Sequence, residues 1–360
     1  MTEGIRRVVQ RLSDLRLSHL RALALGALAA GCAHSVPEPP APVSVGPPSA
    51  HSTTLFSRFG RLTLSSLSGE GISLPPLPIA MPTLDWFPRR PLQGTAVVVR
   101  IRYAPGDPIS EPVSLEVAGR EVHLARSPRG WVGLAALPLD SAGPIELVAR
   151  YGLRSKEHRD NLVVLAGARS YPSTRLRVAP RGEGRPEVDA RIREERELIQ
   201  AALRDWTPDW LPAEPFGWPR PPELTSPFGQ RRVFNGVTQS RHLGLDLRGT
   251  RGTPVYAPAA GRVALLGNFF YQGNAVYLDH GLGLITAYFH LSSTDVRQGD
   301  LVEPGQLLGR VGSTGRSTAP HLHWSAYVNG QNVDPASLIG LELGVLREGG
   351  AARATGEGDR

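Results

Sequence analysis

Short stretches of alternating apolar and polar residues, punctuated by glycine and proline, dominate two long parts of this chain. The segment V-S-L-E-V-A-G-R-E-V-H-L-A-R over 113–126 alternates on both sides of a glycine turn. A period of two places every second side chain on one face of a strand, and glycine and proline end strands. The 40 glycines and 33 prolines argue against a helical bundle. We therefore expect a mainly β protein built from short strands.

Changes in composition divide the 360 residues into six segments. Each alternating region is long enough to form a domain of its own, and proline-rich or polar stretches separate them. The predicted segments are a signal peptide over 1–32, a proline-rich tether with an uncertain continuation over 33–91, a β-sandwich over 92–182, a helix with a connector over 183–221, a second β domain over 222–342, and a disordered tail over 343–360.

One segment has a helical pattern. Residues 186–204 read P-E-V-D-A-R-I-R-E-E-R-E-L-I-Q-A-A-L-R, with apolar residues at 188, 192, 198, 199 and 203. Proline is tolerated in the first turn of a helix, and apolar residues at this spacing form a stripe along one side. We predict a helix over 186–204 that acts as a strut between the two β domains.

The N-terminus has the pattern of a secretory signal. Five arginines lie within residues 6–21, and a short apolar run ends at Cys32, the only cysteine. A basic region, a short apolar region and small residues are typical of such signals, and this run is too short for the ~20 residues that span a bilayer. The sequence A-A-G-C resembles a bacterial lipoprotein signal, which implies lipidation of Cys32 and a membrane tether. An ordinary signal peptide with an incidental cysteine is the alternative.

The location that follows is the cell envelope, on the periplasmic side. Ala33 after the cysteine does not present the usual inner-membrane retention signal, so the outer membrane is slightly favoured.

Nucleic acid is not an expected partner. Five arginines against Glu3 and Asp14 within 1–32 account for +3 of the formal charge of +7, and the rest is spread thinly with no basic run interleaved with aromatics.

Histidines gather in the second β domain, where five of the ten lie between 242 and 323. His242 and Asp246 occur in H-L-G-L-D, where Gly244 argues against a helix. In an extended chain residues four apart share a face, so these two side chains point the same way. Asp279 and His280 precede two glycines and fit a turn instead.

A second pair of histidines occurs in the sequence P-H-L-H-W. His321 and His323 are two residues apart, so they share one strand face while Leu322 points to the other. If this pair meets His242 and Asp246 across neighbouring strands, two nitrogens and one carboxylate oxygen would suit Zn²⁺ with a fourth position open to water. H-x-H alone also fits a structural pair. Spacing does not decide which of the two histidines is the ligand.

Several ordered motifs between 224 and 341 resemble one known family. They are S-P-F-G-Q-R-R, R-H-L-G-L-D-L, G-T-P-V-Y-A-P-A-A-G-R-V, G-N-A-V-Y-L-D-H-G, Y-F-H-L, V-G-S-T-G-R-S-T-A-P-H-L-H-W and V-D-P. Together they are similar to the zinc metallopeptidases of the lysostaphin/LytM type, family M23. The resemblance implies a compact antiparallel β-sheet with a narrow groove, and cleavage of peptide bonds in peptidoglycan.

Carried over position by position, the resemblance assigns the site. It makes His242, Asp246 and His323 the ligands of one Zn²⁺ per chain. His290 and His321 become the catalytic histidines, which orient the water, accept its proton and stabilise the oxyanion.

Two other positions, Asn274 and Arg241, stand within these motifs. Asn274 matches a frequent residue of the family and is interpreted as structural. Arg241 stands where relatives often have a smaller residue, and it would narrow the groove or contact a substrate carboxylate.

The regions before the second β domain bear on location and specificity. The predicted helix and the stretch R-L-R-V-A-P ahead of it resemble the connector of envelope members with an N-terminal immunoglobulin-like domain. We therefore expect a zinc endopeptidase of a Gram-negative-type periplasm, acting on D-alanyl–diaminopimelate cross-links, with an unknown regulatory envelope partner.

The alternative is a non-catalytic member that activates another wall hydrolase, although such members have usually lost zinc ligands. A cupin-type site would need a glutamate where Tyr327 and Val328 stand.

Overall fold

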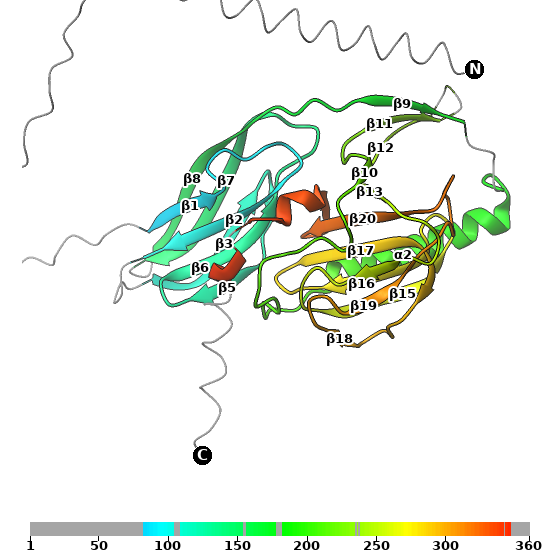
Figure 1. Cartoon of the computed structure of the whole chain (residues 1–360). Helices are drawn as coiled ribbons and strands as arrows, with labels where there is room; N and C mark the ends of the chain where they lie inside the picture. Colours follow the sequence, from blue (N-terminus) through cyan, green and yellow to red (C-terminus); the bar gives the residue numbers. More distant parts are fainter. Residues whose placement is uncertain are drawn as a thin grey trace, which may run out of the picture. The chain divides into compact units, whose positions relative to one another are not determined.

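The computed structural model describes residues 82–103, 109–153, 156–177, 182–234, 236, 238–341 and 343–346 (Figure 1). The predicted signal peptide, the lipidation at Cys32 and most of the tether lie outside these residues. Across the described ranges, no helix combines the length and the apolar character needed to cross a membrane.

The N-terminal described part contains two antiparallel sheets with a shared core (Figure 1). Val99, Leu115 and Leu147 are fully buried between them, as the alternating pattern predicts. The predicted β-sandwich is therefore confirmed, and its immunoglobulin-like character stays a prediction. One sheet has the order β1 (Thr83–Phe87), β2 (Ala96–Arg102), β6 (Gly130–Ala136), β5 (Leu124–Ser127); the other has β4 (Arg120–Glu121), β3 (Ile109–Val117), β7 (Gly143–Leu153), β8 (Lys156–Ala166).

The first strand begins before the predicted boundary at 92. Residues 83–87 pair with β2, and Leu84 and Trp86 pack against the sandwich core. Partial burial of these two alternating side chains explains why the sheet extends upstream.

In the C-terminal described part, ten strands form one antiparallel sheet, as expected. Its central strands are buried, with Tyr277, Tyr288 and Trp324 fully enclosed. The order along the main path is β10 (Leu224–Ser226), β13 (Leu245–Arg248), β20 (His321–Val328), β17 (Leu284–Thr294), β16 (Gly273–Asp279), β15 (Gly261–Phe269), β18 (Leu301–Val302); beside it, β14 (Pro254–Tyr256) pairs with β19 (Leu307–Val311), β19 also pairs with β17, and β21 (Gln331–Val333) pairs with β20.

The predicted helix is confirmed as α2 (Pro186–Arg204), which begins with Pro186 in its first turn. Its last turns pack on the large sheet, where Ile199 and Leu203 join a cluster with Phe269 and Tyr277 (Figure 1). Leu198, also part of the predicted apolar stripe, is exposed. At its middle, Glu195 accepts a hydrogen bond from the backbone N–H of Phe270 at 2.6 Å. The helix therefore covers a face of the sheet, which differs from the strut expected from sequence.

A separate sheet of three strands is formed by segments that precede and follow the helix in sequence. β11 (Arg231–Phe234) pairs antiparallel with β12 (Thr238–Arg241) and parallel with β9 (Ser173–Leu176). β9 precedes α2 and β11 follows it, so this small sheet joins segments from both sides of the helix. Its last strand, β12, ends at Arg241, immediately before the predicted ligand His242.

The predicted disordered tail begins too early at 343. Residues 343–346 form the 3-10 turn η2 (Leu343–Leu346), which follows η1 (Pro335–Leu338). Leu343 and Leu346 are buried in an apolar cluster with Leu134 of the sandwich and Val328 of the large sheet. The hydrophobic effect holds this segment in place, and the remainder of the tail lies outside the described residues.

Acidification is expected to destabilise the fold through His280. This imidazole is fully buried; Nδ1 donates to the carbonyl of Ala260 and Nε2 accepts from the hydroxyl of Thr286, both at 2.7 Å. Burial lowers the pKa of His280 from 6.5 to about 4. Between these values only the unfolded chain binds the proton, so the free energy of unfolding falls as pH drops through this window, by on the order of 3 kcal/mol.

Urea unfolding at pH 7.5 and 4.5 tests this prediction. The difference in unfolding free energy between the two pH values should be smaller in His280→Gln than in the wild type, because glutamine does not titrate. An equal pH dependence in both proteins would contradict it.

Candidate metal centre

The pairing of β13 with β20 brings the two predicted halves of the site together. In this antiparallel register Asp246 lies opposite His323, and Arg248 lies opposite His321. Leu245 and Leu247 on one strand, and Leu322 on the other, are almost completely buried on the opposite face. A shift of one residue would expose these leucines, so the apolar face fixes the register that places Asp246 beside His323.

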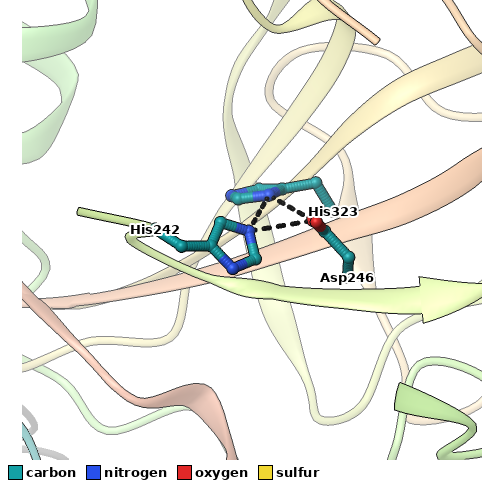
Figure 2. Close-up of side chains that lie close together, drawn as sticks. All are labelled: His242, Asp246 and His323. Atoms are coloured by element: carbon teal, nitrogen blue, oxygen red, sulfur yellow. Dashed lines mark hydrogen bonds and ion pairs between the residues drawn. The ribbon is translucent and has the colours of Figure 1, made fainter. Parts of the chain in front are cut away.

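Three side-chain atoms from the predicted ligands lie at the corners of a small triangle (Figure 2). Nε2 of His242 is 2.9 Å from Oδ1 of Asp246 and 3.0 Å from Nδ1 of His323, and the third side is 2.8 Å. His242 lies in the short connection between β12 and β13, which bends at Gly244. The structure thus gathers all three predicted ligands at one point.

Neighbouring hydrogen bonds fix which ring nitrogen of each histidine carries a proton. Nδ1 of His242 contacts the carbonyl of Pro227 at 2.8 Å, and a carbonyl can only accept, so this nitrogen donates. Ser325 donates its hydroxyl proton to the carbonyl of Leu243, and its oxygen therefore accepts from Nε2 of His323 at 2.9 Å. In each ring the other nitrogen, the one in the triangle, is then the position that can offer a lone pair.

The charge states favour a cation at this point. Burial alone would raise the pKa of Asp246, but its contacts with His242 and His323 lower that pKa well below the usual range, so the carboxylate is ionised. Burial lowers the pKa of His323 to about 4, against the opposing effect of Asp246, so this ring is neutral near pH 7. Two lone pairs and a carboxylate oxygen facing one another require a positive charge between them.

The donor set fits zinc. His242, Asp246 and His323 offer two nitrogens and one oxygen that lie together within ligand range. Zinc bonds of about 2.0–2.1 Å in a tetrahedral arrangement would place neighbouring donors about 3.3 Å apart, close to the separations found here. Three protein ligands also leave the fourth position open, which is typical of catalytic zinc sites.

Gly244 makes room for the ring of His323. A Cβ atom at this position would lie 2.5 Å from Nε2 of His323 and 2.6 Å from the carbonyl oxygen of Trp324. A larger residue could not coexist with the present position of the His323 ring. The glycine between His242 and Asp246 therefore has a steric role that its sequence spacing did not reveal.

The two predicted catalytic histidines lie beside the triangle. The rings of His290 and His321 have centroids 4.9 Å apart, and Nε2 of His321 is 3.6 Å from Oδ1 of Asp246. Nδ1 of His290 donates to the carbonyl of Thr314 at 2.8 Å, and Nδ1 of His321 donates to that of Ala319 at 2.7 Å. Each ring thus keeps Nε2 as its available acceptor.

His290 lies at an irregularity in β17. Between two aligned pairs, Phe289 and His290 face the single residue Ala275 on β16, which is the pattern of a β-bulge. His290 adopts a positive φ of 62°, which is uncommon for a residue with a side chain. Burial, together with His323 and His321, lowers its pKa to about 3, so the ring is neutral near pH 7.

Asp279, Asn274 and Arg241 make contacts that stabilise the fold. Asp279 accepts from the backbone N–H of Gly281 at 2.9 Å, as expected for a turn. Nδ2 of Asn274 donates to the carbonyl of Leu291 at 3.0 Å, which agrees with its structural interpretation. Arg241 pairs with Asp140 of the sandwich, a contact that neither of its expected roles anticipated.

Sequence reasoning missed two groups around the triangle. Arg232 donates to the second oxygen of Asp246 at 2.7 Å, and Ser325 accepts from His323. Neither is a ligand type, and two arginines stand together at 231 and 232, so the sequence alone could not say which one faces the site. The H-x-H-x-S spacing does place Ser325 on the histidine face of β20.

Comparisons with known proteins agree with this geometry. The profile of peptidase family M23 matches residues 240–335. A crystal structure of a candidate peptidase M23 from Pseudomonas aeruginosa superposes with a TM-score of 0.53 and 33% identity, over 70% of this chain and 96% of that one.

Two curated relatives match the same region of the chain. The DD-carboxypeptidase/endopeptidase Mpg of Neisseria meningitidis is 45% identical over 115 residues, which are 32% of this chain and 26% of that protein. The peptidoglycan DD-endopeptidase ShyA of Vibrio cholerae is 41% identical over 113 residues, 31% of this chain and 26% of that protein. This chain thus spans about a quarter of the length of these relatives.

Proposed function

This chain belongs to peptidase family M23, and on that premise we propose that it is a zinc-dependent endopeptidase that hydrolyses peptide cross-links of peptidoglycan. The observation that carries the proposal is the triangle of His242, Asp246 and His323, whose lone pairs converge with two further histidines beside it. The similarity to proteins named as DD-endopeptidases supports the D-alanyl–diaminopimelate cross-link as the bond that is cut.

His242, Asp246 and His323 would hold the metal in this proposal. Zinc bound there would polarise an amide carbonyl and acidify a water molecule. The protein supplies two imidazole nitrogens and the ionised carboxylate that this cation needs, and it fixes both rings through Pro227 and Ser325. Such second contacts raise the basicity of the ligands and hold their orientation.

His321 and His290 would handle the proton and the developing charge. His321 is placed to accept the proton of the attacking water, because its Nδ1 is engaged by Ala319 and its Nε2 reaches toward Asp246. His290 is anchored by Thr314 and held by the bulge of β17, so its Nε2 can orient that water. Once it holds that proton, His321 could donate a hydrogen bond to the oxyanion and then transfer the proton to the leaving amine.

The location belongs to the same proposal and rests on the sequence. The basic and apolar leader with Cys32 supports export and a lipid anchor, which would tether the enzyme in the periplasm facing the cell wall. A lipid anchor would also raise the local concentration of the enzyme at its polymeric substrate.

A paired measurement tests the proposed function. The chain from residue 33 onward is purified, zinc per chain is quantified, and the protein is incubated with cross-linked muropeptide dimers that are read by mass spectrometry. One zinc and conversion of dimers to monomers is the expected result, and the product masses name the bond. A monomeric pentapeptide in parallel shows whether a terminal D-alanine is also removed.

The other outcomes have distinct meanings. Zinc without cleavage of any muropeptide would contradict the proposed substrate. Absence of both zinc and cleavage would favour the alternative of a non-catalytic activator of another wall hydrolase.

A further inference from the structure

Arg232 holds the carboxylate oxygen that the triangle does not use. Its Nη2 donates to Oδ2 of Asp246 at 2.7 Å and to the hydroxyl of Ser226 at 2.9 Å. Oδ1 of the same carboxylate is the oxygen shared with His242 and His323. The two oxygens of Asp246 therefore have different partners, a guanidinium on one side and a pair of imidazoles on the other.

The side chain of Arg232 is largely buried, which indicates that its ion pair with Asp246 holds it in place. Its side chain is 21% exposed, and that of Asp246 is 11% exposed. Within the described part of the chain, Nε of Arg232 is buried and has no hydrogen-bond partner. A buried unpaired donor is unfavourable, so a guanidinium would not take this position without a compensating interaction. The contact with Asp246 is that interaction.

The backbone around Arg232 is held on both sides. In β11, Arg232 lies opposite Ser240 of β12 and Thr174 of β9. One residue earlier, Nε2 of Gln230 donates to Thr174 at 2.8 Å, and Oε1 of Gln230 accepts from Ser226 at 2.6 Å. This chain of contacts fixes both Arg232 and Ser226, the two groups that meet at Nη2.

We propose that Arg232 is a positioning residue that keeps Asp246 a single-oxygen metal ligand. The proposal rests on the proposed zinc site. A carboxylate with both oxygens free can rotate, or can bind a cation through both of them. Because Arg232 occupies Oδ2, only Oδ1 is available, and the fourth position stays open for water and substrate.

The test measures zinc affinity in the full chain by competition with a chelator. Arg232→Gln is expected to bind zinc ~10- to 100-fold more weakly than the wild type, the usual cost of losing an outer contact of a metal ligand. Arg231→Gln is the matched control, because Arg231 is adjacent on β11 and its side chain is exposed. It should keep wild-type affinity. Arg232→Lys keeps the charge without the planar fork and should be intermediate.

A second readout addresses the coordination mode directly. Co²⁺ in place of zinc absorbs visible light more strongly in four-coordinate than in higher-coordinate sites, so the spectrum reports geometry. Arg232→Gln should lose intensity as the second oxygen of Asp246 joins the metal, whereas Arg231→Gln should not. Thermal unfolding of the metal-free proteins checks that the variants are folded, and Arg232→Lys replaces Arg232→Gln if the latter is not.

The outcomes separate this inference from the proposed function. If the wild type binds zinc but cleaves no muropeptide, the proposed substrate is wrong while the zinc affinities still decide the role of Arg232. Equal affinity and equal Co²⁺ spectra in the Arg232 variant and the wild type would overturn the inference, whatever the cleavage activity. A wild type that binds no zinc would overturn both.

Discussion

Replacement of His323 by alanine is expected to remove zinc and to reduce cleavage of cross-linked muropeptides to background. His323 contributes one corner of the triangle, and its Nδ1 lies within 3.0 Å of both other donor atoms. Loss of an outer contact typically weakens metal binding 10- to 100-fold, so loss of a direct ligand should weaken it by more than ~100-fold. The measurement is zinc per chain after dialysis, with muropeptide products read by mass spectrometry.

His158→Ala is the control for this experiment. His158 stacks on Tyr151 in the sandwich and takes no part in the triangle, so its variant should keep zinc and activity. One tightly bound zinc in His323→Ala would show that the ligand assignment is wrong.

Replacement of His290 is expected to abolish cleavage while zinc stays bound. His290 lies outside the triangle, and its ring is 6.0 Å from that of His323, so the three donor atoms should remain in place. Removal of a group that moves or orients a proton lowers kcat by about 10²- to 10⁴-fold. Steady-state cleavage and zinc content of His290→Ala are measured on the same preparation.

Backbone strain at His290 calls for a second variant. The residue has a positive φ of 62°, where alanine is disfavoured and asparagine is tolerated. His290→Asn should fold like the wild type by thermal unfolding and still fail to cleave. Loss of zinc from this variant would contradict the placement of His290 outside the metal ligands.

Much of the fold could be predicted from local patterns. The period of two in 113–126 and the helical pattern over 186–204 depend only on near neighbours along the chain. The structure confirms a strand in the first segment and the helix over the second. Boundaries were less predictable. β1 begins at Thr83 and η2 continues to Leu346 because their apolar side chains join cores built from distant strands. Burial of that kind has no local signal.

The candidate site was also only partly predictable from the sequence. The candidate side chains could be named because the motifs resemble those of a known family, and their types are those that zinc requires. Arg232 could not be separated from Arg231, since the face that each residue presents depends on how β11 pairs with β9 and β12. The bulge that carries His290 was equally hidden, because it depends on the alignment of β17 with β16.

The sequence by itself determined that His321 and His323 share a strand face, because successive side chains of any strand alternate. Only the tertiary structure decided which of them lies against Asp246. The register of β13 and β20 places His323 opposite Asp246, and His321 two residues away beside Arg248. That register is set by the leucines packed behind both strands, whose burial is a property of the whole sheet and cannot be derived from either motif alone.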